Sequence, residues 1–133
     1  MKLTNTPDFI IIDDDPINNM ICNKIIAMTI PGATIKTFTD AENGLKHIMS
    51  TYSPIDSGNA ILLLDINMPF LSGWETLDRM SDFPDLVKEH IKIFMLSSSI
   101  DPLDHEKANN NALVSGYIAK ALSQSKLQAI LPV

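Results

Sequence analysis

Side chains that can bind metal or phosphate follow short apolar runs at four places in this sequence. Carboxylates follow two of the runs, hydroxyl groups follow another, and an ammonium group follows the last. Oxygen ligands select a hard cation such as Mg²⁺, and a carboxylate can also attack phosphorus and form an aspartyl phosphate. A lysine and a hydroxyl would then neutralise charge on the transferring group. The residues, in chain order, are Asp13, Asp14 and Asp15, then Asp65, then Ser97, Ser98 and Ser99, and finally Lys120.

The apolar runs alternate with segments of helical periodicity, and this alternation predicts strand–helix units. The run 60–64 is apolar at every position, as expected for a strand that is covered on both faces. Five such units argue for an α/β fold with an open, doubly wound parallel sheet and helices on both faces. The expected strands are 9–12, 33–38, 60–64, 91–96 and 114–119.

Capping residues mark where the helices begin. Asp15 and Pro16 suit the first turn of a helix, and Ser72 with Glu75 has the spacing of a capping box. The first helix is expected to end at Pro31 and to carry one apolar face, because five apolar residues recur at helical spacing. These are Ile17, Met20, Ile21, Ile25 and Met28.

The polar residues fall at the carboxyl ends of the expected strands. In open α/β sheets, ligands bind beyond these ends, near the point where the strand order reverses. We therefore expect the carboxylates, the hydroxyls and the ammonium group to meet at one rim. Carboxylates held close together repel one another and are hard to keep ionised without a cation. The rim is thus predicted to bind Mg²⁺, which typically keeps waters and phosphate oxygens as further ligands.

Length and charge limit the classes of protein to which this chain can belong. A chain of 133 residues has the size of one domain. Its net charge of −6 offers no electrostatic footprint for nucleic acid or an anionic membrane. No apolar run approaches the ~20 residues of a membrane span, and residues 1–8 do not read as a signal peptide. The lone Cys22 is expected to be a buried thiol. We therefore expect a cytoplasmic protein with neither nucleic acid nor membrane as a partner.

Four motifs, taken in order, resemble the receiver domain of two-component response regulators. The motifs read IIIDDDP, LLLDINMPFLSG, FMLSSS and GYIAK. The most specific part runs from Asp65 to Pro69, with Gly73 eight residues after Asp65. The resemblance covers residues 9–131 and implies a flavodoxin-like (βα)5 fold with strand order 2-1-3-4-5. It also implies a single receiver domain over residues 1–133, with its core at residues 8–131 and no output domain.

The resemblance assigns the phosphoryl and metal chemistry to particular residues. Asp65 would be the phosphoacceptor, which takes a phosphoryl group from a histidine kinase or a histidine phosphotransfer protein. Asp14 and Asp65 would bind Mg²⁺ directly, and Asp13 would bind it mainly through water. The backbone carbonyl of Asn67 would supply a further metal ligand.

Other residues would respond to the phosphoryl group. Ser97 would hydrogen-bond to it, Lys120 would pair with it, and Tyr117 would change rotamer together with Ser97 as a switch. Ser99 and Ala121 are candidate modulators. Receivers usually carry Lys-Pro with a cis peptide bond where this chain has Lys120–Ala121. We expect the cis bond to be retained, although before a residue other than proline it costs about 2.5–4 kcal/mol.

Two other functions agree with parts of the pattern. A Mg²⁺-dependent phosphatase of the haloacid-dehalogenase type would place its nucleophile directly after the first strand, in an Asp-x-Asp-x-Thr-like run that residues 13–17 do not match. A degenerate receiver would no longer take phosphate and would act only as a docking module, and the departure at Ala121 keeps this alternative open. As an active receiver, the protein would be a signalling domain rather than an enzyme. Its output would pass through contacts with a downstream protein.

Overall fold

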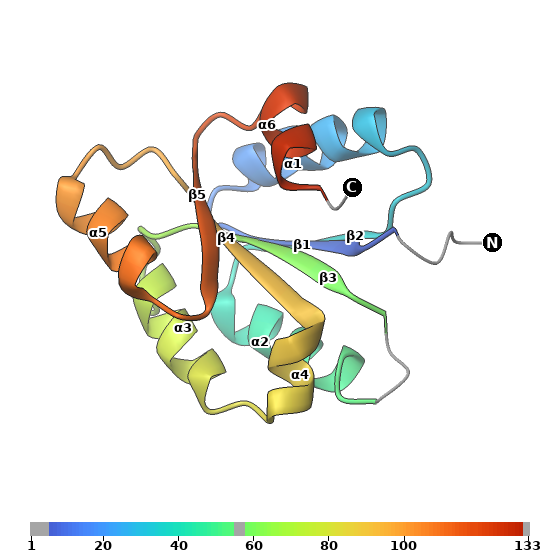
Figure 1. Cartoon of the computed structure of the whole chain (residues 1–133). Coiled ribbons are helices and arrows are strands. Elements are labelled where there is room, and N and C mark those ends of the chain that lie inside the picture. The colour runs from blue at the N-terminus through green and yellow to red at the C-terminus, as the bar shows by residue number, and fades with distance from the viewer. Residues whose placement is uncertain (1–5, 55–57, 132–133) are drawn as a thin grey trace.

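A five-stranded parallel sheet forms the centre of the molecule in this computed structural model, which describes residues 6–54 and 58–131 (Figure 1). The strand order is β2-β1-β3-β4-β5, and every neighbouring pair is parallel. This confirms the predicted fold class and strand order. The strands are β1 (Asp8–Ile12), β2 (Ile35–Phe38), β3 (Ala60–Leu64), β4 (Ile91–Ser97) and β5 (Val114–Ala119).

Helices cover both faces of the sheet. Helices α1 and α6 lie side by side on one face, whereas α2, α3, α4 and α5 lie on the other (Figure 1). The connection from β3 to β4 holds two helices instead of the one expected, because Pro84 starts a second, short helix. In the described part of the chain, no helix has the length and apolar character needed to cross a membrane. The helices are α1 (Pro16–Thr29), α2 (Ala41–Thr51), α3 (Gly73–Ser81), α4 (Asp85–His90), α5 (Pro102–Asn110) and α6 (Gln124–Ile130).

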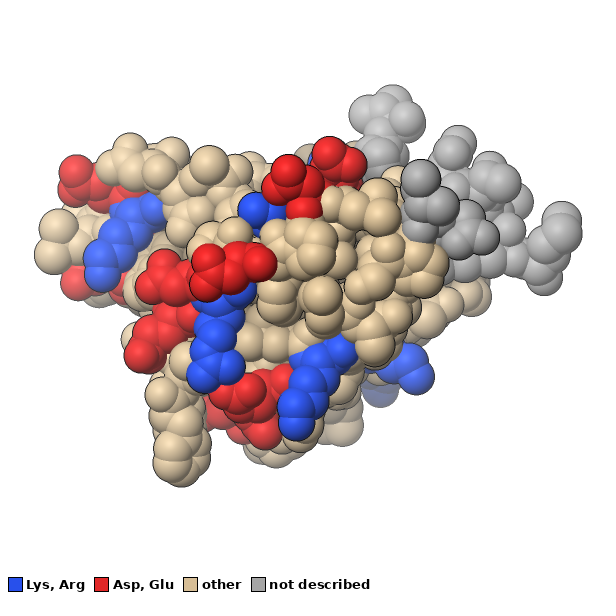
Figure 2. All heavy atoms as spheres, turned by 90° about the horizontal axis from the view of Figure 1, so that it is seen from below, with Lys and Arg blue, Asp and Glu red and all other residues tan. Residues whose placement is uncertain are grey.

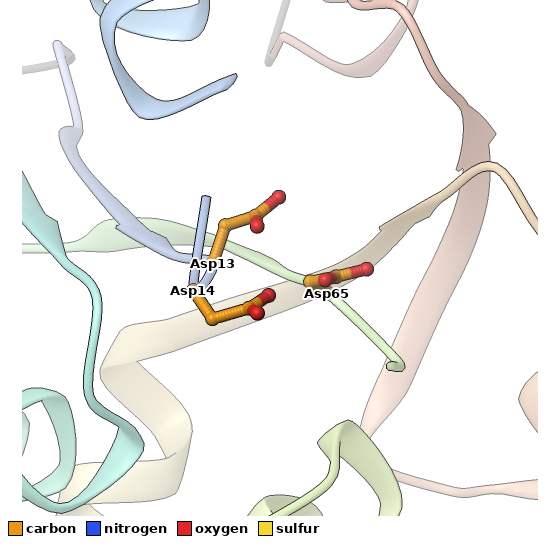
Figure 3. A group of neighbouring side chains, drawn as sticks. All are labelled: Asp13, Asp14 and Asp65. Atoms are coloured by element: carbon orange, nitrogen blue, oxygen red, sulfur yellow. The ribbon is translucent and has the colours of Figure 1, made fainter. Parts of the chain in front are cut away.

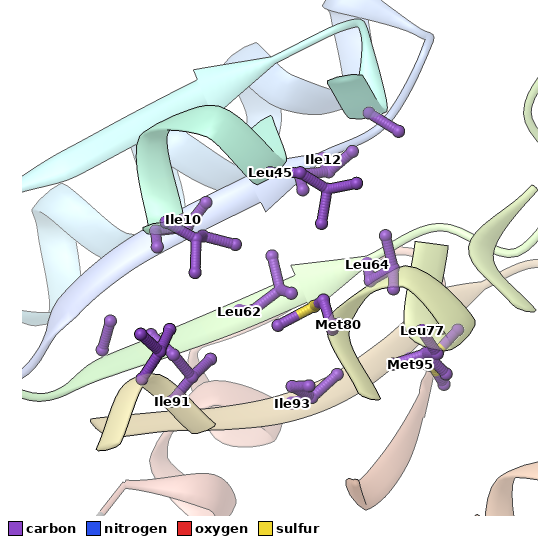
Figure 4. Packing of buried hydrophobic residues seen from close by; sticks show 14 of the residues in the cluster. Ile10, Ile12, Leu45, Leu62, Leu64, Leu77, Met80, Ile91, Ile93 and Met95 are labelled. Atoms are coloured by element: carbon purple, nitrogen blue, oxygen red, sulfur yellow. The ribbon is translucent and has the colours of Figure 1, made fainter. Parts of the chain in front are cut away.

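The central strands are buried on both sides, which explains why their sequences are unbroken apolar runs. Ile10 and Ile12 of β1 pack with α2 and α3 in the cluster of Figure 4. Phe9 and Ile11 point the other way and pack against α1 and α6. Full burial of such a side chain contributes roughly 1.5–3 kcal/mol, so these two layers hold the sheet together from both faces.

The register of the sheet brings the two acidic segments to the same edge. Ile12 at the end of β1 lies opposite Leu64 at the end of β3, and the N–H of Asp65 donates to the carbonyl of Ile12 at 3.0 Å. The next residues along the two strands, Asp13 and Asp65, therefore leave the sheet at the same level. Packing of apolar residues thus determines where the carboxylates meet.

Helix α1 buries a different face from the one predicted. Of the five apolar residues expected to share a core-facing side, Ile25 packs against the core. The other four, which are 40% to 64% exposed, are Ile17, Met20, Ile21 and Met28. The residues on the buried side are Asn18, Asn19, Cys22 and Ile26.

Hydrogen bonds at the start of α1 explain this orientation. Asn18 Nδ2 donates to Asp13 Oδ2 at 2.8 Å, and Asn19 Nδ2 donates to the backbone oxygen of Asp13 at 3.0 Å. Because buried polar groups require such partners, the two asparagines fix how α1 is rotated about its axis. Cys22 follows Asn18 by one turn and is buried as predicted, and this burial raises the pKa of its thiol to about 11.

Side-chain caps begin several helices, and an ion pair joins the exposed surfaces of two of them. The predicted capping box of α3 forms between Ser72 and Glu75, and Asp15 caps α1. On the face seen in Figure 2, acidic and basic side chains are intermixed. One ion pair on α2 and α3 joins Arg79 to Glu42 at 2.8 Å.

Gly73 sets how closely α3 approaches the end of β3. Its N–H donates to the carbonyl of Ile66 at 2.8 Å. A Cβ at this position would overlap the carbonyl oxygen of Asp65 and would lie 2.9 Å from the Cα of Ile66. The first turn of α3 thus packs directly on the backbone that carries Asp65.

We expect Gly73→Ala to lower the free energy of unfolding by about 1–3 kcal/mol, the usual range for overpacking a close-packed interior. Gly58→Ala is the matched control, because among the described residues a Cβ there meets no atom within 4 Å. Urea unfolding of the two variants measures the difference. Equal stabilities would show that α3 can move away from β3 without cost.

Candidate functional site

The carboxyl ends of the strands converge on one rim, where the structure gathers the predicted residues. Asp13 and Asp14 follow β1, and Asp65 follows β3 (Figure 3). One oxygen from each of these carboxylates lies within 4.8 Å of the others. Ser97 ends β4, and the N–H of Lys120, just after β5, donates to its carbonyl at 3.0 Å. The rim therefore combines the acids, the hydroxyl and the ammonium group in one place.

Asp13 is the most thoroughly hydrogen-bonded carboxylate of the rim. It is 1% exposed, and its Oδ1 accepts from the N–H of Asp15 at 2.9 Å. Its Oδ2 accepts from Asn18 Nδ2 at 2.8 Å and pairs with Lys120 Nζ at 2.7 Å. These donors replace the water that Asp13 loses on burial, which is the condition for keeping a buried carboxylate charged.

Asp65 is buried as well, but it is less well compensated. It is 5% exposed, and Lys120 Nζ lies 3.6 Å from its Oδ1. Burial and the charge of Asp13, with a smaller effect from Asp14, raise the pKa of Asp65 to about 6. Lys120 and a hydrogen bond from the backbone of Asn67 oppose this rise only in part. Ionised Asp65 is thus held at an energetic cost in the absence of a cation.

Lys120 lies between the two buried carboxylates and is closer to Asp13. Burial opposes its charge, but the hydrogen bond to Asp13 and the charges of Asp65 and Asp13 outweigh burial and raise its pKa above 10.5. The peptide bond from Lys120 to Ala121 is cis, as expected. Lys120 is therefore fully charged at neutral pH, within reach of both acids.

The donor set fits a hard divalent cation. Each of the three carboxylates offers oxygen, which Mg²⁺ prefers over nitrogen and sulfur. A cation between them would cancel the repulsion that raises the pKa of Asp65 and would replace the hydration lost by burial. The exposed Asp14 leaves one side of the group open to solvent. The three carboxylates are thus suited to hold a metal ion, with one side left open for further ligands.

The hydroxyl side of the rim is joined to the loop after β4. Ser97 is 1% exposed, and its Oγ accepts from the N–H of Ser99 at 3.2 Å. Tyr117 is partly buried, and its hydroxyl donates to the carbonyl of Ser99 at 3.0 Å. The hydroxyl of Ser99 donates to Asp104 Oδ2 at 2.6 Å. Ser99 thus turns toward α5, whereas Ser97 lies at the rim itself.

Two contacts of the site were not predicted from the sequence. Asn18 binds Asp13, and the sequence signal for this contact is the pair of asparagines in the first turn of α1, directly after the acidic segment. Asp104 binds Ser99 and also accepts from Trp74 Nε1 at 3.2 Å. Trp74 and Asp104 lie 30 residues apart, so no local pattern indicates their contact.

We expect Asp65→Asn to stabilise the metal-free protein at neutral pH by about 1–3 kcal/mol, from a pKa rise of roughly two units. The pKa of Asp65 is raised from 3.8 to about 6 by folding, so the folded state holds the proton more tightly. Stability therefore falls as the pH rises from 3.8 to 6, and the full penalty remains at neutral pH. Chemical unfolding in chelator measures the gain.

Two controls accompany this measurement. The advantage of Asp65→Asn should vanish as the pH falls below 3.8, because the carboxyl of Asp65 is then protonated in both the folded and the unfolded state. Saturating Mg²⁺ should remove it as well, since the cation stabilises the ionised wild type. A gain that is independent of both pH and Mg²⁺ would show that charge repulsion at Asp65 is not its cause.

Comparison with known proteins gives the same description of the chain. The family described as the response regulator receiver domain matches residues 9–132. Among curated relatives, the 3′,5′-cyclic-nucleotide phosphodiesterase regA of Dictyostelium discoideum is 25% identical over 128 residues, 92% of this chain and 15% of the relative. Stress response regulator protein 1 of Meyerozyma guilliermondii is 35% identical over 80 residues, 60% of this chain and 34% of the relative. The chain thus spans a minor part of each curated relative.

Two solved structures of response regulators resemble this one over nearly their whole length. The response regulator receiver protein of Dyadobacter fermentans has a TM-score of 0.84 and 28% identity, and the match covers 92% of this chain and 93% of that one. The two-component response regulator of Cytophaga hutchinsonii has a TM-score of 0.84 and 30% identity, with 94% and 93% covered. Together with the strand order, the acidic rim and the family match over residues 9–132, these likenesses show that the chain belongs to the response regulator receiver domain family.

Proposed function

We propose that this receiver domain accepts a phosphoryl group on Asp65 from a phosphohistidine of a histidine kinase or a histidine phosphotransfer protein, with Mg²⁺ as cofactor. The observation that supports this best is the position of Asp65, buried at the end of β3 among other carboxylates and within reach of Lys120. In the transfer, an oxygen of Asp65 forms a bond to phosphorus while the phosphorus–nitrogen bond to the histidine breaks. The electron pair of that bond stays on the imidazole nitrogen.

The acids of the rim would bind the cation in two ways, directly and through water. Asp14 and Asp65 would bind Mg²⁺ directly, together with the backbone carbonyl of Asn67, and Asp13 would act mainly through water. When bound, the cation supplies positive charge against the oxygens of the transferring group. The hydrogen bonds from Asn18 and Lys120 that already engage Asp13 favour this indirect role for it.

The remaining residues of the rim would stabilise the phosphoryl group. Lys120 Nζ lies 2.7 Å from Asp13 and 3.6 Å from Asp65, so a small movement of a flexible side chain brings it to an oxygen of a group on Asp65. The buried hydroxyl of Ser97 would donate to another oxygen. Tyr117, bonded to the loop after Ser97, would adjust with it and transmit the change to a downstream protein in the cytoplasm.

The phosphatase alternative has less support from the rim. It needs a nucleophile directly after β1, which here is Asp13. Both oxygens of Asp13 are engaged by donors from Asp15, Asn18 and Lys120, and such donors lower the nucleophilicity of a carboxylate. The docking-only alternative would need no cation-binding acids, whereas three of them meet here. Phosphoryl acceptance on Asp65 is therefore the function that the rim supports best.

Incubation with acetyl phosphate and Mg²⁺ should label the protein once, on Asp65. We expect a stoichiometric mass increase of one phosphoryl group that chelator prevents, because the transfer needs the charge of the cation. Asp65→Asn should abolish the label, and the exposed Asp78→Asn on α3 should leave it intact as the matched control. Intact-protein mass spectrometry with peptide mapping gives the readout. Labelling that persists in Asp65→Asn would assign another acceptor, and continuous release of phosphate without a stable label would favour the phosphatase.

The exposed apolar side of α1 offers the phosphohistidine protein a place to dock. Helix α1 starts directly after the acidic loop, so its first turns lie beside the site. Ile17 and Met20 there are 62% and 64% exposed. Exposed apolar side chains next to a reactive group are suited to a partner that must approach it closely. We therefore propose that the partner covers Ile17 and Met20 while its histidine faces Asp65.

Replacing Ile17 and Met20 with serine should slow phosphotransfer from the cognate phosphohistidine protein about tenfold, the usual size for losing anchor residues of an interface. Labelling by acetyl phosphate should stay within twofold of wild type, because the small donor needs no docking surface. Met49→Ser, on the exposed part of α2, is the matched control. The donor is first identified by phosphotransfer profiling of histidine kinases. An equal loss with both donors would indicate damage to the site instead.

A further inference from the structure

Ser99 is held by hydrogen bonds through its amide, its hydroxyl and its carbonyl. Its N–H donates to Ser97 Oγ at 3.2 Å, and its hydroxyl donates to Asp104 Oδ2 at 2.6 Å. Its carbonyl accepts from the hydroxyl of Tyr117 at 3.0 Å, and its Oγ accepts from the N–H of Asp101 at 3.2 Å. A loop residue with so many partners has little freedom to change its orientation. The direction of its N–H toward Ser97 is therefore fixed.

Asp104 anchors this arrangement to two helices. It lies in the first turn of α5, and its Oδ1 accepts from Trp74 Nε1 of α3 at 3.2 Å. Its Oδ2 is the acceptor for the hydroxyl of Ser99. Hydrogen bonds to a carboxylate are stronger than those between neutral groups. A continuous chain of hydrogen bonds thus runs from α3 through Asp104 and Ser99 to the hydroxyl of Ser97.

The last hydrogen bond of this series, from Ser99 to Ser97, restricts the direction in which the Ser97 hydroxyl can donate. A hydroxyl has one hydrogen to donate and lone pairs to accept. Ser97 Oγ already accepts from Ser99, so the direction of its own hydrogen is restricted. The hydroxyl is therefore free to donate to an oxygen of a bound ligand. An N–H that donates to the oxygen also polarises the O–H bond and strengthens its donation. Ser97 is buried at the rim, and its backbone carbonyl accepts from the N–H of Lys120. Under the proposed function, its hydroxyl would donate to an oxygen of the phosphoryl group on Asp65.

We propose that Asp104 is a positioning residue for phosphoryl transfer, which acts through Ser99 to orient the hydroxyl of Ser97. This inference rests on the proposed function, because the orientation matters only if a phosphoryl group is bound at Asp65. Asp104 itself does not touch the reacting atoms. Its role is to keep the loop after β4 in the one arrangement that directs the amide of Ser99 at Ser97.

A purely structural role for Asp104 predicts different behaviour. As an acid in the first turn of α5, Asp104 interacts favourably with the helix dipole, and that effect depends only on its charge. Positioning depends on its hydrogen bonds. Asp104→Asn separates the two, because asparagine loses the charge but can accept from Trp74 with its oxygen and donate to Ser99 Oγ with its amide. Asp104→Ala loses both.

Labelling rates with acetyl phosphate and Mg²⁺ test the inference in the full chain. We expect Ser99→Ala and Asp104→Ala each to slow labelling about three- to tenfold, the loss that follows from one orienting hydrogen bond. The double variant should be no slower than either single one, because both break the same chain. Asp104→Asn should retain most of the rate. Glu106→Ala, which removes an exposed acid from the same helix, should match wild type.

NMR measurement of amide hydrogen exchange at Ser99, without any phosphodonor, tests directly whether Asp104 holds the Ser99 amide on Ser97. Asp104→Ala should speed exchange of the Ser99 amide at least tenfold, whereas Asp104→Asn and Glu106→Ala should not. Unchanged labelling rates, additive effects in the double variant, or unchanged exchange in Asp104→Ala would each overturn the inference while leaving the proposed function in place. Absence of any label in wild type would instead overturn the proposed function and, with it, the role of Asp104.

Discussion

Repulsion between carboxylates at the ends of two adjacent strands is the constraint on which the other features of this protein depend. The apolar register of β1 and β3 forces Asp13 and Asp65 to leave the sheet at the same level. Burying two like charges so close together is unfavourable unless donors or a cation compensate them. Lys120 supplies one positive charge, but it is shared between both acids. At neutral pH the folded chain thus carries a local excess of negative charge that a bound cation would neutralise.

The need to compensate the buried charge of Asp13 also determines which side of α1 faces the core. The inward side of this helix carries Asn18 and Asn19, which donate to Asp13, in positions where amphipathic packing alone would place apolar residues. As a consequence, apolar residues such as Met20 face solvent. The helix therefore buries less apolar surface, but it supplies hydrogen bonds that hold Asp13 in place. Under the proposed function, these exposed apolar residues would form part of the surface to which the phosphohistidine protein docks.

The fold and most of the rim could be predicted from the sequence, because both depend on local patterns. A strand covered on both faces reads as a continuous apolar run, and the acids follow these runs directly. The buried side of α1 could not be predicted, because hydrogen bonds from Asn18 to Asp13 override the apolar periodicity. The contact of Trp74 with Asp104 escaped prediction for a related reason. It joins two helices far apart in the chain and depends on how the loop after β4 folds.

The unequal compensation of the two buried acids explains how their chemical roles can differ. Donors engage both oxygens of Asp13: the N–H of Asp15 bonds Oδ1, and Asn18 and Lys120 bond Oδ2. Asp65 is held more loosely, and its pKa of about 6 shows that its charge is poorly satisfied. A carboxylate whose lone pairs are engaged is a weak nucleophile, whereas a poorly compensated one gains most from forming a new bond. Under the proposed function, this difference in environment explains why Asp65, rather than Asp13, would be the acid that reacts with phosphorus.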